Sequence, residues 1–186
     1  MPEKRIPPGQ SFREDLIVYD IASVPPLKLE DFRLRLFGQV RNPQDLSWED
    51  LQKLPRLQVR ADFHCVEGWG VPDLLWEGVP ASAILYLVQP EPAVQWVLAH
   101  GRDGYTTNLP FPYFARPDTI LAFSLNGEPL PWEHGWPLRL IVPSLYAYKS
   151  AKYLVALEFS AELKRGYWEE RGYHDVGDIW REERRR

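Results

Sequence analysis

The sequence contains a single cysteine, Cys65, among 186 residues. No disulfide can form within the chain, so nothing in the composition requires an oxidising compartment. A structural zinc site built from several cysteines is excluded as well, because only four histidines accompany this one thiol. The cysteine content therefore favours a chain whose stability comes from its core.

Long apolar runs and an excess of positive charge are also missing. No apolar stretch is long enough to span a bilayer, and residues 1–10 contain neither an apolar signal core nor a twin-arginine pair. The formal net charge is -4, whereas general nucleic-acid binding needs a basic face. We therefore expect a cytoplasmic protein with no membrane span and no nucleic-acid partner.

Proline and tryptophan are abundant instead, with 18 and 8 copies, and 45% of the residues are hydrophobic. Many prolines disfavour long helices and favour short strands joined by ordered loops. Alternating apolar residues predict strands. Two short helices are also predicted, one from the capping-box pattern that begins at Ser47 and one from Pro80, which is suited to a helix start. The strands are predicted over residues 32–36, 57–65, 94–98, 119–125, 138–142 and 153–159.

Turns and boundaries complete this outline of an α+β, mainly β protein. Asn126-Gly127 is a hairpin signal, residues 76–80 read as a turn, and residues 112–116 as a helical turn. We expect an extended N-terminal arm over residues 1–29, one compact domain over 30–175 and a charged C-terminal tail over 176–186.

Cys65 is the first candidate for chemistry. It ends an apolar row on a predicted strand and precedes a Gly-Trp-Gly loop, a position typical of a group that faces a pocket. Three interpretations stay open: a small buried hydrophobe, a nucleophile with a histidine base, or a thiolate ligand for a soft metal. His64 is its neighbour, but adjacent strand residues point to opposite faces, and His100, His134 and His174 have no spacing that selects one as the base.

A cationic segment over residues 133–152 is the second candidate. His134, Arg139, Lys149 and Lys152 gather here in a chain that is acidic as a whole. Such a cluster indicates either an anionic ligand, which backbone N–H groups near Gly135 and Ser150 would help to bind, or an ordinary charged turn.

Tyr105 is the third candidate, in the polar loop Asp103-Gly-Tyr-Thr-Thr-Asn108 that follows a predicted strand. Its hydroxyl group either donates to a substrate oxyanion or packs on the turn. No phosphate-binding loop, dinucleotide fingerprint, zinc-protease helix or glycosidase carboxylate pair is present in the sequence.

Five segments in this order resemble the molybdopterin-binding domain of the sulfite oxidase family, over roughly residues 30–175. The resemblance is strongest to small single-domain bacterial and archaeal members, which are relatives of the periplasmic enzyme that reduces methionine sulfoxide. The segments are Phe63-His-Cys-Val-Glu-Gly-Trp69 with Trp76-Glu-Gly-Val-Pro80, Asp103-Gly-Tyr-Thr-Thr-Asn-Leu-Pro110, Asn126-Gly-Glu-Pro-Leu-Pro131, His134-Gly-Trp-Pro-Leu-Arg-Leu-Ile-Val-Pro143 and Tyr148-Lys-Ser-Ala-Lys-Tyr153.

The resemblance implies the family's α+β fold of layered mixed sheets with short helices, one molybdopterin and one molybdenum. Cys65 would be the protein thiolate on the metal, and Tyr105 matches the family's active-site tyrosine. The implied activity is oxygen-atom transfer to or from a small substrate, with a separate electron donor or acceptor protein. The residues implied to bind the cofactor are His64, His134, Arg139, Lys149, Ser150 and Lys152.

The sequence also departs from the sulfite oxidases proper. Their Arg-x-Asn-His segment before the cysteine is not found, since Arg41-Asn42 is followed by Pro43. Sulfite itself is therefore not implied as the substrate. Two alternatives to an oxidoreductase remain at this level: a non-catalytic binding or assembly module with the same fold, and a Cys-dependent hydrolase.

Overall fold

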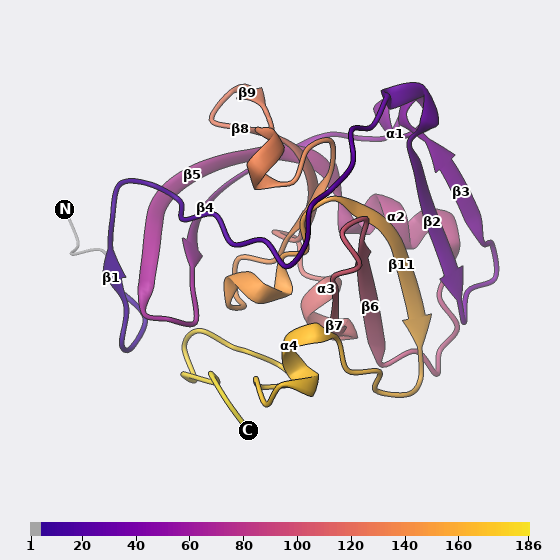
Figure 1. The fold of residues 1–186 in the computed structure, drawn as a ribbon. Coiled ribbons are helices and arrows are strands. Elements are labelled where there is room, and N and C mark those ends of the chain that lie inside the picture. The colour runs from indigo at the N-terminus through magenta and orange to yellow at the C-terminus, as the bar shows by residue number, and fades with distance from the viewer. Residues whose placement is uncertain (1–4) are drawn as a thin grey trace.

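Two mixed β-sheets form the body of the molecule, seen in a computed structural model that describes residues 5–186 (Figure 1). Within residues 5–186 the first sheet has six strands, in which β5 is central and pairs with β1 in parallel and with β4 and β8 antiparallel. Its strands are β1 (Ser11–Phe12), β4 (Leu57–His64), β5 (Trp69–Pro80), β8 (Ile120–Leu125), β9 (Glu128–Pro129) and β10 (Arg139–Ile141).

In the described part of the chain the second sheet has five strands, in the order β3-β2-β11-β6-β7. Only the β2–β11 pair is parallel in it. Its strands are β2 (Arg33–Gly38), β3 (Gln44–Ser47), β6 (Trp96–Gly101), β7 (Thr106–Pro110) and β11 (Leu154–Ser160). The fold is therefore mainly β with mixed sheets, as the sequence predicts.

The helices are short, as the many prolines require. Ser47 caps the first helix through a complete capping box with Asp50, which confirms the sequence signal. The α-helices are α1 (Trp48–Gln52), α2 (Ala81–Val88), α3 (Phe111–Phe114) and α4 (Tyr167–Glu170), and the 3-10 turns are η1 (Leu29–Asp31), η2 (Trp132–His134) and η3 (Ala147–Lys149). Within residues 5–186, no helix is both long and apolar enough to cross a membrane.

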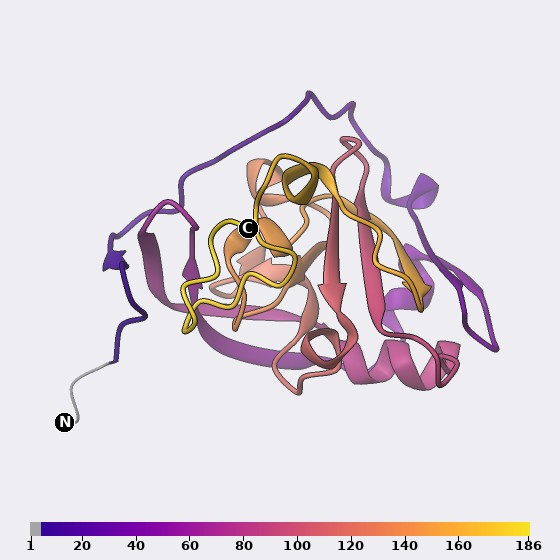
Figure 2. The same cartoon turned by 90° about the horizontal axis from the view of Figure 1, so that it is seen from below.

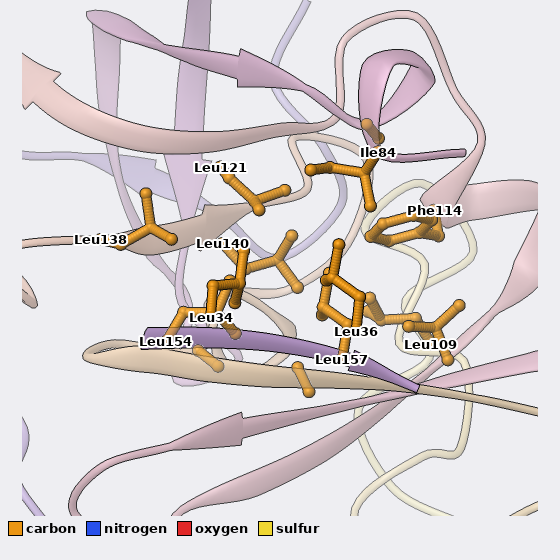
Figure 3. Close-up of a cluster of buried hydrophobic side chains, with 14 of the residues drawn as sticks. Leu34, Leu36, Ile84, Leu109, Phe114, Leu121, Leu138, Leu140, Leu154 and Leu157 are labelled. Carbon is orange, nitrogen blue, oxygen red and sulfur yellow. The ribbon is translucent and has the colours of Figure 1, made fainter. Parts of the chain in front are cut away.

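The main hydrophobic core lies between the two sheets (Figure 3). Leu34 and Leu36 of β2 and Leu157 of β11 face Leu121 of β8 and Leu140 of β10 across it. Because side chains alternate along a strand, the neighbours of Leu121 and Leu140 point to the other face of the first sheet. Ile120 and Ile141 belong there to a second apolar cluster, with Phe63 and Trp76.

The chain termini wrap around this body. The arm passes from β1 to η1 along the outside of the molecule, and the C-terminal segment ends near α4 (Figure 2). The described part of the arm begins at Arg5, so residues 1–4 of the predicted arm lie outside the described residues. The C-terminal segment is less solvated than its charge suggests, because Ile179 is buried and Arg184 contacts the arm.

Two local predictions were wrong. The expected turn at residues 76–80 is the second half of β5, in which Gly78 is required because an added Cβ atom would lie 2.0 Å from the Leu121 carbonyl oxygen. The expected polar loop around Tyr105 leads directly into β7, which begins at Thr106 and was not predicted.

Candidate functional site

A cavity of about 410 Å³ lies on the side of the first sheet that faces away from the main core. Its volume is within the range of small-molecule sites. Within residues 5–186, five parts of the chain line it: arm residues 16–21, residues 63–69 around the turn after β4, Asp103 and Tyr105 before β7, the stretch from η2 to Lys152, and Trp168 with Tyr173. The polar and titratable lining residues are Tyr19, Asp20, Cys65, Glu67, Asp103, Tyr105, Glu133, His134, Arg139, Tyr148, Ser150, Lys152 and Tyr173.

Cys65 lines this cavity at the end of β4, with 8% of its surface exposed. Its backbone N–H donates to the Trp69 carbonyl at 2.7 Å and closes the turn to β5. Burial, the largest cause, raises the pKa of the Cys65 thiol to about 11. A cysteine nucleophile needs the opposite change in pKa, so the hydrolase alternative loses support, whereas a metal ion removes the thiol proton itself.

His64 lies outside the cavity lining, on the opposite face of β4, as strand alternation predicts. It is almost fully buried, and its Nδ1 atom lies 3.0 Å from the side-chain oxygen of Gln10 on the arm. The structure therefore places His64 behind the cysteine rather than beside a ligand in the cavity.

Arg139 is the most informative cation of the lining. Its residue surface is only 7% exposed, and its guanidinium donates from Nε to the Ser150 carbonyl at 3.2 Å and from Nη1 to the His134 carbonyl at 3.1 Å. Among residues 5–186 no carboxylate lies within ion-pair distance of it. Burial lowers its pKa to about 10, which still leaves it charged at neutral pH. A buried charge without a counter-ion is costly, so this cavity favours an anion.

The other expected cofactor-binding residues gather around Arg139. Gly135 has a φ of +111°, and an added Cβ atom would lie 3.0 Å from the Lys152 Cα atom, so only glycine lets these two segments approach. Burial, and then the charge of Arg139, lower the pKa of His134 and favour its neutral form. The Ser150 N–H donates to the Ala147 carbonyl at 3.0 Å and is therefore occupied. The Ser150 hydroxyl accepts from the Val142 N–H and still has a proton to donate.

Lys152 and Lys149 differ in what holds their ammonium groups. The Lys152 ammonium pairs with Asp20 of the arm and donates to the Glu133 carbonyl at 3.1 Å, at the edge of the cavity. Lys149 does not line the cavity. Its ammonium is fully buried, 2.6 Å from Glu169, and also donates to the Asn108 and Asp175 carbonyls at 2.8 Å. Lys149 therefore has a complete set of partners without any ligand.

Tyr105 lines the cavity and is buried. Its hydroxyl donates to the backbone carbonyl of Tyr148, and its N–H is fixed by the Asp103 carboxylate at 3.0 Å. Burial raises its pKa well above the ordinary value, so the phenol keeps its proton at neutral pH. The hydroxyl is thus placed as a neutral hydrogen-bonding group at the cavity wall.

Several residues of the site were not found from the sequence. Arm residues 16–21 cover the cavity, where the Tyr19 hydroxyl donates to the Glu67 carboxylate at 2.7 Å. Trp168 and Tyr173 come from the C-terminal part of the chain. The apolar run from Leu16 to Val18 was the only available signal, because the contacts join segments that lie far apart in the sequence.

Comparisons with known proteins decide the family. The family model described as "Oxidoreductase molybdopterin binding domain" matches residues 21–168. The chain belongs to this family. It is an oxidoreductase domain of the sulfite oxidase type, whose cofactor is molybdopterin with molybdenum.

Relatives within and near this family support the assignment. The chain is 39% identical over 181 residues to the uncharacterized oxidoreductase YuiH of Bacillus subtilis, covering 97% of this chain and 91% of that protein. It is 31% identical over 158 residues to the protein-methionine-sulfoxide reductase catalytic subunit MsrP of Xanthomonas campestris pv. campestris, covering 76% of this chain and 49% of that protein. The chain thus spans about half the length of this reductase.

A solved structure agrees in fold. The crystal structure of the sulfane dehydrogenase SoxCD from Paracoccus pantotrophus superposes with a TM-score of 0.69 at 27% identity, covering 75% of this chain and 40% of that one. The layered mixed sheets are therefore those of a molybdopterin oxidoreductase domain, as the resemblance implied.

The cavity fits the family's cofactor. Molybdopterin carries a phosphate group, and the buried Arg139 is a cation without a carboxylate partner in the described part of the chain. Molybdenum accepts thiolate ligands, and Cys65 presents a sulfur to the same cavity. The residues of this chain therefore match both ends of the cofactor.

Proposed function

We propose that the cavity binds one molybdopterin with Cys65 as the protein ligand to molybdenum, and that the chain transfers an oxygen atom from a small neutral sulfoxide. The observation that supports this most is Arg139. Arg139 is only 7% exposed, and a buried positive charge with no anion beside it is costly. The cavity that it lines also contains the only cysteine of the sequence.

The residues would have different roles in binding the cofactor and the substrate. Arg139 and Lys152 supply charge to the phosphate, the Ser150 hydroxyl and the neutral His134 supply hydrogen bonds, and Tyr105 lies at the wall where substrate would bind. The Lys152 ammonium would leave the Asp20 carboxylate to bind the phosphate, or would bind both anions at once. His64 and Lys149 lie outside the cavity lining and would stabilise β4 and η3 rather than bind the cofactor directly.

The bound cofactor supplies the two-electron oxidation and reduction that oxygen-atom transfer requires. A sulfoxide, two protons and two electrons give a thioether and water, and the electrons come from an external carrier. The protein excludes bulk water with the arm and orients the substrate between aromatic walls that include Trp168 and Tyr173. Sulfoxide reduction is the first direction to test, because the similar protein MsrP is named as a methionine-sulfoxide reductase.

The charges of the cavity favour a neutral substrate over sulfite. Among the described lining residues, Arg139 and Lys152 are the only lysine or arginine side chains. If both serve the cofactor phosphate, no cation remains for a sulfite anion. Glu67, next to the cysteine, would repel an anion further.

Metal analysis tests the cofactor part. Protein from a host that makes molybdopterin should contain near-stoichiometric molybdenum, whereas Cys65→Ser should lose most of it and Arg139→Gln should retain less pterin. Arg60→Gln is the matched control, because Arg60 lies on the same sheet, is exposed and donates to the Asp73 carbonyl outside the cavity. Wild-type protein without metal would support the binding-module alternative, and unchanged metal in Cys65→Ser would remove Cys65 as a ligand.

Steady-state assays test the substrate part. The loaded enzyme should oxidise a reduced viologen dye when methionine sulfoxide or dimethyl sulfoxide is added. It should not reduce ferricyanide when sulfite is added. The reverse pattern would overturn the substrate proposal without affecting the cofactor site. A cytoplasmic location is also proposed, with which the single cysteine is compatible, since it can form no disulfide within the chain.

A further inference from the structure

The turn that carries Cys65 is short and depends on few backbone contacts. Residues 65–68 join β4 to β5, and the Gly68 N–H donates to the Cys65 carbonyl at 3.1 Å. Gly68 has a φ of +101°, and an added Cβ atom would lie 3.0 Å from the Gly9 carbonyl of the arm. The arm is thus packed directly against the turn.

Two side chains from opposite ends of the chain bind this turn from outside the cavity. Gln10 donates from Nε2 to the Cys65 carbonyl at 3.0 Å, and its side-chain oxygen lies 3.0 Å from Nδ1 of His64. Arg184 donates from Nη1 to the Val66 carbonyl and from Nη2 to the Gly9 carbonyl at 2.9 Å. In Figure 1 the first and last coloured parts of the chain both come close to the end of the β4–β5 hairpin.

We propose that Arg184 and Gln10 are positioning residues that fix the Cys65 sulfur for the metal by binding the carbonyl groups of Cys65 and Val66. This inference rests on the proposed role of Cys65 as the molybdenum ligand. It also gives His64 a role, because His64 fixes the orientation of the Gln10 amide.

The chemistry of the two side chains suits this task. Arginine presents several N–H donors in a rigid fork, so one side chain joins the turn, the arm and the C-terminal segment. Lysine keeps the charge but lacks the fork. The side chain of Arg184 is 25% exposed, and Glu182 lies 3.4 Å from its Nε atom, so the fork is held in place. A ligand atom displaced by a fraction of an ångström changes the properties of a metal site.

The first experiment uses the apo protein and needs no cofactor. Hydrogen exchange of a peptide that covers residues 63–70 should speed up by about tenfold in Arg184→Ala and in Gln10→Ala, as expected for the loss of a hydrogen bond or two. Arg181→Ala is the control, since Arg181 lies on the same segment, its side chain is 71% exposed, and its only ion pair within residues 5–186 is with Glu183 at 4.0 Å. Unchanged exchange in both variants would overturn the positioning role.

The second experiment uses the loaded enzyme. Arg184→Ala should alter the electron paramagnetic resonance signal of Mo(V) and make the midpoint potential more negative, because a positive charge has been removed near the metal. Arg184→Lys should restore the potential more than the signal, since it restores the charge without the fork. A signal and potential identical to the wild type in Arg184→Ala would refute the inference. Absence of molybdenum from the wild type would instead count against the proposed function, and the apo exchange result would stand separately.

Discussion

The buried pair of Lys149 and Glu169 offers a test that separates a structural role from a ligand-binding one. The sequence assigns Lys149 to cofactor binding, whereas its ammonium group lies 2.6 Å from the Glu169 carboxylate with both side chains 0% exposed. Burial lowers the pKa of Lys149 to about 8, and the Glu169 charge opposes this lowering, so the amine keeps its proton at pH 7. Removing the lysine would leave a buried carboxylate without its counter-ion.

We expect Lys149→Met to lower the free energy of unfolding by about 3 to 5 kcal/mol. For a chain of this size, that corresponds to a fall in Tm of roughly 6 to 20 °C. The double variant Lys149→Met/Glu169→Gln removes the stranded charge and keeps an acceptor for the Thr107 hydroxyl, which donates to Glu169 at 2.6 Å. It should recover about 2 kcal/mol relative to the sum of the single losses.

Chemical denaturation and calorimetry of the apo proteins measure these differences. Lys53→Met is the control, because its pair with Glu49 is exposed and should contribute no more than about 1 kcal/mol. Loss of less than about 1 kcal/mol in Lys149→Met, or no recovery in the double variant, would refute the structural reasoning. In the loaded protein, the double variant should retain its pterin. Pterin loss from a stable double variant would restore Lys149 as a direct cofactor ligand.

Three further predictions concern the cysteine, a glycine and the core. Burial raises the pKa of Cys65 from 9.0 to about 11, so alkylation of the apo protein by iodoacetamide should accelerate with rising pH until about pH 11; a plateau below pH 9 would contradict this. Gly78→Ala should lower Tm far more than Gly127→Ala, because an added Cβ atom at Gly78 meets the Leu121 carbonyl at 2.0 Å. At Gly127 the Cβ atom meets nothing within 4 Å, and only the φ of +85° is strained; equal Tm losses would contradict the strand packing. Phe114→Ala should cost about 3 to 5 kcal/mol in a denaturation experiment, since the ring is fully buried, and a loss under about 1 kcal/mol would show that the core collapses around the gap.

Local patterns in the sequence predicted much of the fold. Alternation of apolar residues predicted β2, β4 and β6, because a half-buried strand has a period of two residues. Apolar segments also predicted β8, β10 and β11. Ser47 and Asp50 predicted the start of α1, and Asn126-Gly127 predicted the β8–β9 hairpin, since both signals act within four residues. The prediction of a turn at Gly78 was wrong, because this glycine allows β5 and β8 to approach each other closely. No local sequence pattern reveals such an approach.

The order of the motifs in the sequence was sufficient to predict the family, which the match of the family model confirms. The resemblance also implied that Cys65, Tyr105, Arg139, Ser150 and Lys152 act at one site, and the structure brings all five to one cavity. The tertiary structure decided the direction of each side chain. Lys149 turns away from the cavity in η3 while its neighbours Tyr148 and Ser150 line it, because a 3-10 turn places successive residues about a third of a turn apart. The contacts of Gln10 and Arg184 with the cysteine turn likewise exist only after the two ends of the chain have folded together.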